Sequence, residues 1–215
     1  MLFKLDELSK HLKDVRGVFH IGAHYGQELE TYKKLNVKDI VFFEPVIESY
    51  LKLNDMIKDF DTEGFNIRTE NVALGHRDGV KKMYMETANQ GQSCSLLKPK
   101  EHLKLYPSIT FDSQEEVTQT FLDKYVEENG IDMSRFNLIN IDVQGYELEV
   151  FKGASNVLHD IDFIYTEVNL VEVYENCAKM GELDEFLGDI YGFERVLTKL
   201  TKGDTWGDAL YVKSR

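Results

Sequence analysis

The residues from Val18 to Glu28 constrain the fold of this chain more than any other stretch. The run 18–21 favours a buried strand, because β-branched and aromatic residues pack well on a sheet. Gly22 and Gly26 bracket the turn that follows, and apolar residues then recur at a broadly helical spacing over 29–35. The stretch therefore predicts a strand, a glycine turn and a helix in direct succession.

A second apolar run, 40–43, stops at Glu44, eighteen residues after Gly26. A helix N-terminus offers free N–H groups to an anion, and an acid that ends the next strand can accept hydrogen bonds from ribose hydroxyls. The turn has the form G-x-x-x-G and lacks the third glycine of the dinucleotide fingerprint. Together, the turn and Glu44 predict a nucleotide-type cofactor site.

The rest of the chain continues the alternation of strands and helices. Strands are predicted over 65–74, before a turn at Gly75, over 136–142, which ends at Asp142, and over 161–169. Helical patterns lie between these strands, and this order is typical of an α/β protein with a parallel sheet. The last two predicted strands are joined by a short turn and should pair antiparallel.

Seven strands, five alternating with helices and two in a C-terminal hairpin, indicate the class I methyltransferase fold. This is a Rossmann-like, mostly parallel sheet with helices on both faces. We expect one domain over 1–215, with an N-terminal helical segment over 1–16 and an irregular insert over 76–135. Within the insert, weak strand patterns over 80–85 and 117–120 are separated mainly by polar sequence.

Charge and composition disfavour several classes of protein. The net charge of −13 argues against binding to a nucleic-acid backbone. Eighteen consecutive apolar residues occur nowhere, and the N-terminal residues do not resemble a secretory signal, so we expect no membrane span and a cytoplasmic location. Cys94 and Cys177 lie outside any metal-ligand spacing and are expected to be reduced thiols. The oligomeric state stays open.

Several motifs resemble those of the FkbM-type methyltransferase family, and the resemblance extends over about residues 18–213. The main motifs are Ile21-Gly22-Ala23-His24-Tyr25-Gly26, Phe43-Glu44-Pro45, Asn71-Val72-Ala73-Leu74-Gly75 and Ile141-Asp142-Val143-Gln144-Gly145-Tyr146-Glu147. The resemblance implies S-adenosylmethionine as cofactor and methylation of an oxygen of a small molecule or sugar. One departure is His20, which stands where the family often has an acid that contacts the cofactor's amino group.

On this basis the predicted cofactor-binding residues are Gly22, His24, Gly26, Glu44, Asn71, Ala73 and Asp142. Gly22 and Gly26 would let backbone N–H groups face the cofactor's carboxylate, and His24 could add a donor. Glu44 would accept from the ribose, and Asn71 and Ala73 would border the adenine.

Asp142 and Glu167 are the predicted catalytic residues. Asp142 ends the central strand, so it could orient the acceptor hydroxyl, touch the cofactor or accept the released proton. A carboxylate is a weak base unless burial or a neighbouring acid raises its pKa, and Glu167 and Glu147 are candidate neighbours. Glu147 taken alone is better explained as a first-turn acid favoured by the helix dipole. Asp142 and Glu167 could also hold a divalent cation, but no histidine or cysteine spacing supports one, and we predict no metal.

Two other function classes stay open at this point. A cofactor-binding module without catalysis is favoured mainly by His20. A nicotinamide-dependent oxidoreductase is disfavoured by the missing third glycine and by the terminal hairpin.

Overall fold

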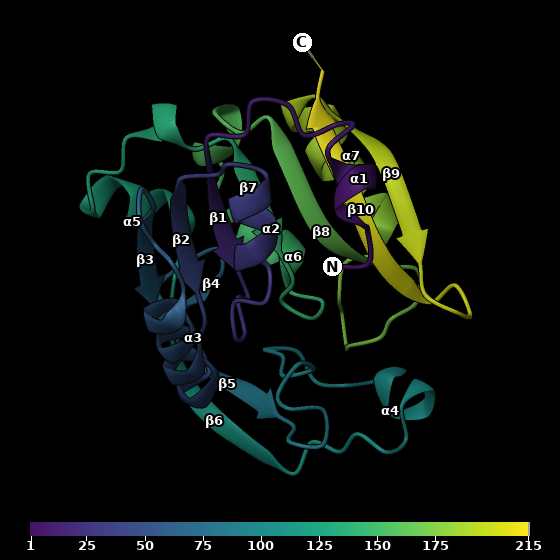
Figure 1. Cartoon of the computed structure of the whole chain (residues 1–215). Helices are drawn as coiled ribbons and strands as arrows, with labels where there is room; N and C mark the ends of the chain where they lie inside the picture. The colour runs from purple at the N-terminus through teal and green to yellow at the C-terminus, as the bar shows by residue number, and fades with distance from the viewer. Residues whose placement is uncertain (215) are drawn as a thin grey trace.

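The computed structural model describes residues 1–214 and contains a seven-stranded and a three-stranded sheet (Figure 1). The larger sheet has the order β3-β2-β1-β7-β8-β10-β9. Its strands are β1 (Gly17–Ile21), β2 (Asp39–Phe43), β3 (Asn66–Glu70), β7 (Leu138–Ile141), β8 (Phe163–Asn169), β9 (Phe193–Leu200) and β10 (Trp206–Lys213). The first five in the chain run parallel, and β10 pairs antiparallel with both β8 and β9. The predicted sheet and terminal antiparallel pair are confirmed.

Helices cover both faces of this sheet, as predicted (Figure 1). The covering helices are α1 (Leu5–Leu8), α2 (Leu29–Lys34), α3 (Ile47–Asp59), α5 (Leu122–Glu128), α6 (Glu147–Lys152) and α7 (Met180–Tyr191), with short 3-10 turns at Met133–Arg135 and Val157–His159. A further short helix, α4 (His102–Leu105), lies in the insert, away from the large sheet (Figure 1). Successive side chains of a strand point to opposite faces, so Phe19 and Ile21 join the cluster under α5, α6 and α7. Val18 joins the other cluster, under α1, α2 and α3.

Two predicted segments differ from the structure near the ends of the parallel core. Only α1 is helical within 1–16, although Leu8 and Leu12 are buried as their spacing predicts. The strand predicted over 65–74 is broken, because β3 ends at Glu70 and β4 (Ala73–Leu74) belongs to the second sheet. The chain leaves the large sheet between them.

The insert over 76–135 is more regular than predicted. It contributes β5 (Gly79–Met85) and β6 (Ser113–Thr120), which pair antiparallel, while β4 pairs parallel with β6. Val117 and Met83 are buried in a small cluster of their own. The second sheet lies below the carboxyl ends of the large sheet in Figure 1. Within residues 1–214, no helix combines the length and the apolar character needed to cross a membrane.

Candidate functional site

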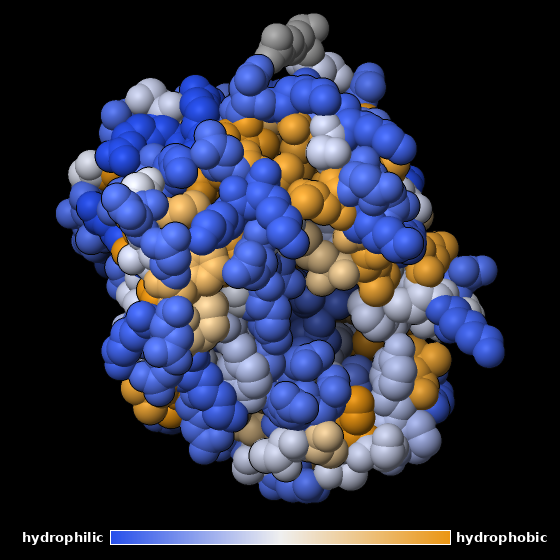
Figure 2. Space-filling model, viewed as in Figure 1, coloured by the Kyte–Doolittle hydropathy of each residue, from blue (hydrophilic) through white to orange (hydrophobic). Residues whose placement is uncertain are grey.

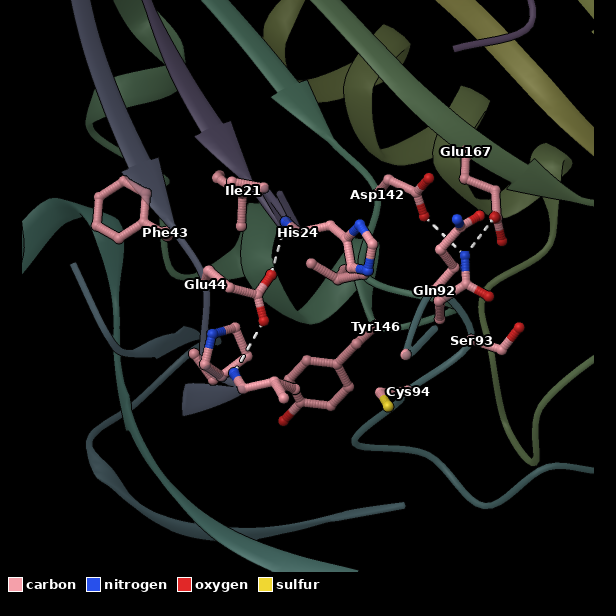
Figure 3. Close-up of a pocket in the computed structure, with 18 of the residues that line it drawn as sticks. Ile21, His24, Phe43, Glu44, Gln92, Ser93, Cys94, Asp142, Tyr146 and Glu167 are labelled. Atoms are coloured by element: carbon pink, nitrogen blue, oxygen red, sulfur yellow. Dashed lines mark hydrogen bonds between the residues drawn. The ribbon is translucent and has the colours of Figure 1, made fainter. Parts of the chain in front are cut away.

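A cavity of about 560 Å³ lies at the carboxyl ends of the parallel strands. Its walls come from the loops after β1, β2, β7 and β8 and from the insert. Figure 2 shows a hollow near the middle of this face, and Figure 3 shows the side chains inside it. The strand order reverses at β1, between β2 and β7, and open α/β sheets place their ligands at such a switch point.

Gly22 lines the cavity, but a side chain is excluded there by the backbone that follows the neighbouring strand β7. Its φ is +80°, and a Cβ would lie 1.9 Å from the carbonyl oxygen of Asp142. The N–H groups of Gly22 and Ala23 both donate to the Phe43 carbonyl at 3.0 Å. The expectation that the Gly22 N–H faces a cofactor carboxylate is therefore wrong: this turn locks β1 to its neighbours.

Gly26 also has a packing role. Its φ is +75°, and a Cβ would lie 2.5 Å from Met56 Cε and 2.6 Å from Leu53 Cδ1 of α3. Its N–H donates to the Ala23 carbonyl at 2.8 Å, so it too does not face a cofactor carboxylate. Gly26 lies outside the cavity lining, and α2 begins only at Leu29.

His24 lines the cavity and links the glycine turn to the loop over 87–94. Its Nε2 lies 2.8 Å from the Gln90 carbonyl oxygen and its Nδ1 lies 2.9 Å from Gln27 Nε2. These partners favour the tautomer with the proton on Nε2, because a carbonyl only accepts and an amide N–H donates. The ring stacks on Tyr25 with centroids 3.6 Å apart. Both ring nitrogens of the predicted donor thus already have protein partners.

Glu44 reaches the cavity as predicted, and it also braces two loops (Figure 3). Its Oε2 accepts from the backbone N–H of His24 at 2.7 Å and its Oε1 accepts from that of Val46 at 2.8 Å. Burial raises the pKa of Glu44 to about 7, although both hydrogen bonds work in the opposite direction. Each carboxylate oxygen has two lone pairs, so acceptor capacity remains for a ligand.

Asn71 and Ala73, predicted to border the adenine, differ in position. Ala73 is buried and lines the cavity. Asn71 lies outside the lining, and its amide donates to the carbonyls of Glu44 and Pro45 at 2.9 and 3.0 Å. Asn71 therefore holds the loop that carries Glu44 in place.

The two predicted catalytic acids meet at one amide, that of Gln144. Gln144 Nε2 donates to Asp142 Oδ1 at 2.7 Å and to Glu167 Oε2 at 2.8 Å (Figure 3). The Tyr174 hydroxyl lies 2.8 Å from Gln144 Oε1 and 3.0 Å from the Ser93 carbonyl oxygen, and the direction of the amide follows from its two bonds to the acids. Sequence reasoning missed Gln144, whose φ of +55° turns it back toward the two acids.

Both acids hold protons more tightly than free carboxylates do. Asp142 is open to the cavity but deeply enclosed by protein, and this enclosure, with the charge of Asp208, raises its pKa to about 6. Burial, followed by the charges of Asp142 and Glu147, raises the pKa of Glu167 well above its ordinary value. Enclosure and like charge together provide the conditions under which a carboxylate can act as a base.

Glu147 lies in the first turn of α6, as expected, but its side chain points into the protein. It is buried, and its Oε1 accepts from the backbone N–H groups of Val143 and Gly145, both at 3.1 Å. Its Oε2 has no partner among the described residues, and burial raises its pKa to about 7. Glu147 thus braces the turn that carries Gln144.

His20 is buried and lines the cavity as a neutral side chain. Burial lowers its pKa to about 4, and its Nδ1 lies 3.1 Å from the Tyr32 hydroxyl. Its Nε2 is 4.0 Å from a carboxylate oxygen of Glu28, which also lines the cavity. Sequence reasoning missed Glu28, an acid close to the position where the family resemblance implies one.

Within residues 1–214, no group of three or more histidines, cysteines or acids is arranged to hold a metal ion. Asp208 lies opposite Glu167 in the β10–β8 register and is buried, so it adds charge near the acid pair. The sequence did not predict that Asp208 lies opposite Glu167, because no neighbouring strand was predicted for the terminal hairpin. Cys94 and Cys177 are both free and buried.

Comparison with known sequences gives one family. The model of the methyltransferase FkbM domain matches residues 20–195. The protein named 2-O-methyltransferase NoeI from Sinorhizobium fredii (strain NBRC 101917 / NGR234) is 29% identical over 164 residues, which cover 74% of this chain. The chain spans 65% of the length of that curated relative.

Solved structures share the fold. The methyltransferase FkbM from Methylobacillus flagellatus KT has a TM-score of 0.62 and 14% identity, over 95% of this chain and 45% of its own. Magnesium protoporphyrin IX methyltransferase from Synechocystis PCC 6803, with bound SAM, has a TM-score of 0.53 and 11% identity, over 98% and 78%. A putative tRNA (m1A22) methyltransferase from Streptococcus pneumoniae has a TM-score of 0.54 and 12% identity, over 100% and 72%. These likenesses confirm the predicted fold class.

Proposed function

Because the chain belongs to the FkbM methyltransferase family, we propose that it transfers a methyl group from S-adenosylmethionine to a hydroxyl of a small molecule or sugar. The observation that carries the proposal is one cavity that holds both Glu44 and the Asp142–Glu167 pair at the switch point of the sheet. The name of the curated relative, a 2-O-methyltransferase, supports oxygen as the atom that is methylated.

The cavity fits the cofactor in its charge and in its acceptors. Glu44 retains lone pairs for ribose hydroxyls and Ala73 offers a small apolar wall for the adenine. The carboxylates of Asp142 and Glu28 suit a ligand that carries positive charge on sulfur and on its amino group. When bound, S-adenosylmethionine supplies an electrophilic methyl group on a sulfonium that leaves as a neutral thioether.

Glu28 is the residue that we assign to the cofactor's amino group. It lies in the lining beside His20, which is neutral and cannot hold an ammonium group by charge. The departure at His20 therefore does not leave this end of the cavity without an acid. This assignment weakens the argument for a binding module without catalysis.

Asp142 carries the chemical role that the chain itself supplies. Its carboxylate accepts the hydrogen bond of the acceptor hydroxyl, orients the oxygen and receives the proton as the new carbon–oxygen bond forms. Gln144 holds Asp142 and Glu167 at fixed positions, so the main contribution of the protein is alignment of two bound reactants. Because the pKa of Glu167 is also raised, Glu167 can share the proton that Asp142 receives, and the two acids titrate as a pair.

Titration calorimetry and a labelled-methyl assay test this proposal together. We expect purified protein to bind S-adenosylmethionine and S-adenosylhomocysteine, and to transfer label to a hydroxylated metabolite or sugar in a broad panel. Binding without transfer to any member of the panel would favour the binding module. The absence of cofactor binding would contradict the proposed function altogether.

A further inference from the structure

Part of the cavity lining comes from residues that the cofactor assignments above do not use. They include His102 and Tyr106 at α4, Ile109 after it, and Trp206 at the start of β10; we call these four residues the acceptor end. Trp206 Nε1 donates to the Tyr106 hydroxyl at 2.7 Å. Because the polar tips of Trp206 and Tyr106 are bonded to each other, both half-buried rings offer mainly apolar surface to a ligand.

His102 brings an unused polar atom to this end. The residue is 3% exposed, and its Nδ1 has no hydrogen-bond partner among residues 1–214. Its ring lies among those of Tyr106, Phe111 and Tyr174, with centroids 5.1, 5.1 and 5.4 Å away. Burial lowers the pKa of His102, so the ring is neutral near pH 7 and one nitrogen can accept a hydrogen bond. A buried polar atom without a partner favours a ligand that supplies one.

The acceptor end is also coupled to the acid pair through one residue. Tyr174 packs against His102, and its hydroxyl lies 2.8 Å from Oε1 of Gln144, whose amide holds Asp142 and Glu167. Tyr174 therefore links His102 of the acceptor end to the amide that holds the acid pair.

The charges of the lining restrict which ligand can enter. Glu28, Glu44, Asp142 and Glu167 line the cavity, and no lysine or arginine does so among the described residues. The amino group of Met1 also lies at the lining, where it is paired with Glu28 at 3.5 Å. A phosphate or carboxylate on the acceptor would meet like charge without a cationic partner, which is a strong bar to binding.

We propose that the acceptor end binds an uncharged, hydroxyl-rich ring, such as the pyranose of a glycoside. One face of the ring packs on Trp206 and Tyr106, and one hydroxyl donates to His102. Phosphorylated sugars are disfavoured, because the lining holds several acids and no lysine or arginine among the described residues. This inference rests on the proposed function, and it names the class of acceptor and the residues that select it.

Trp206 makes the inference directly measurable, because it is the one tryptophan of the chain. The protein is first saturated with S-adenosylhomocysteine, and Trp206 emission is then followed during titration with the methyl glycosides of glucose, galactose and mannose. The 6-phosphates of the same glycosides are titrated in parallel. We expect a saturable change with at least one methyl glycoside and at least about tenfold weaker binding of its phosphate.

Three results would overturn the inference. They are no response to any of the glycosides in protein that binds S-adenosylhomocysteine, a phosphate that binds as well as its parent, and a response that survives unchanged in a His102→Phe variant. Failure to bind S-adenosylhomocysteine itself would instead remove the proposed function on which the inference rests.

His102→Phe keeps an aromatic ring among its neighbours and removes the nitrogen. We expect it to weaken glycoside binding about tenfold or more and to leave the affinity for S-adenosylhomocysteine unchanged. His159→Phe is the matched control, since His159 is exposed and its ring lies 5.3 Å from that of Tyr191, away from the cavity lining. A second variant, Tyr106→Phe, releases the indole N–H of Trp206 and should shift the emission and weaken glycoside binding even if His102→Phe does not fold.

Discussion

The carboxylate of Glu44 holds the loops after β1 and β2 together at the floor of the cavity. Glu44→Ala removes these two hydrogen bonds together with the predicted ribose acceptor. We expect the affinity for S-adenosylmethionine to fall by about 1.5–3 kcal/mol, the range for hydrogen bonds to a charged group. Calorimetry measures this, with circular dichroism to confirm that the variant is folded. Unchanged affinity in a folded variant would remove Glu44 from the site.

Asp142 separates binding from chemistry. Asp142→Asn keeps the size of the side chain and an acceptor for Gln144, but it removes the charge and the ability to take a proton. We expect turnover to fall about 10²-fold or more, with much less change in cofactor affinity. Asp55→Asn, on the exposed face of α3, is the matched control. A collapse of cofactor affinity together with turnover would place Asp142 among the cofactor contacts instead.

The pKa of about 6 at Asp142 also sets a direction for the pH dependence of the reaction. Because the base must be ionised to accept a proton, turnover should rise as the pH increases from about 5 through 6 and then level off. The Asp142→Asn variant should lose this rise. A pH profile of the same shape in the wild type and the variant would assign the titration to another group.

At the scale of elements, Gly22 joins β1 to β7. A side chain there needs a left-handed backbone and would overlap the carbonyl of Asp142, so Gly22→Ala should destabilise the protein by more than about 2 kcal/mol. Gly181→Ala in α7 is the matched control, because nothing lies within 4 Å of its added Cβ and alanine favours a helix. Urea unfolding of both variants measures the difference. Equal stabilities would show that the turn tolerates a side chain.

The inner strands of the parallel core, β1, β2, β7 and β8, could be predicted because they are buried on both faces, whereas β3 has no buried residue and its bounds were predicted less well. β1 and β2 are buried along their whole length, and each ends at a glycine turn or at an acid. β6 could be predicted only in part, because of its eight residues only Val117 and Gln119 are buried and the rest meet solvent. A strand that buries so little carries almost no pattern in its sequence.

The same reasoning explains which site residues could be found. Glu44 and Asp142 follow apolar strands directly, so their place at the edge of the sheet follows from the sequence. Gln144 faces the cavity because of its left-handed turn. His102 faces it because the insert packs against the segment around Tyr174. The turn is local and the packing of His102 is not, but neither has a signature in residue spacing.

At the scale of the whole molecule, the cavity gathers acids that are costly to ionise together. The pKa values of Asp142 and Glu147 rise to about 6 and about 7, and that of Glu167 is also raised. Between the ordinary carboxyl pKa near 4 and about pH 7, the folded protein therefore holds protons that the unfolded chain has lost. These groups favour folding most at low pH, and their contribution declines as the pH rises through this window. The pKa of His20 is lowered to about 4, so between pH 4 and 6.5 the unfolded chain holds a proton that the folded protein has lost. The contribution of His20 to stability therefore increases as the pH rises through this window.

Glu167→Gln tests this balance of charges. Asn169 can turn its amide to accept from the new side chain, since its Oδ1 has no partner among the described residues. We expect the variant to melt above the wild type at pH 8, by about 2–4 °C for each kcal/mol of repulsion removed, and to match it at pH 5. Melting curves at the two pH values measure this. A variant that is less stable at pH 8 would contradict the proposed repulsion.

The insert carries β5, α4 and β6 and enters the chain after β4, outside the parallel frame that carries Glu44 and Asp142. We expect the frame to supply most of the methyl-donor contacts, while the insert supplies His102 and Tyr106 to the cavity lining. The two parts meet where His24 Nε2 lies 2.8 Å from the Gln90 carbonyl oxygen, so a change within 87–94 would reach the donor side. Exchange of residues 96–111 between relatives leaves that contact in place and should transplant acceptor preference, so that one methyl-transfer reaction can serve different acceptors.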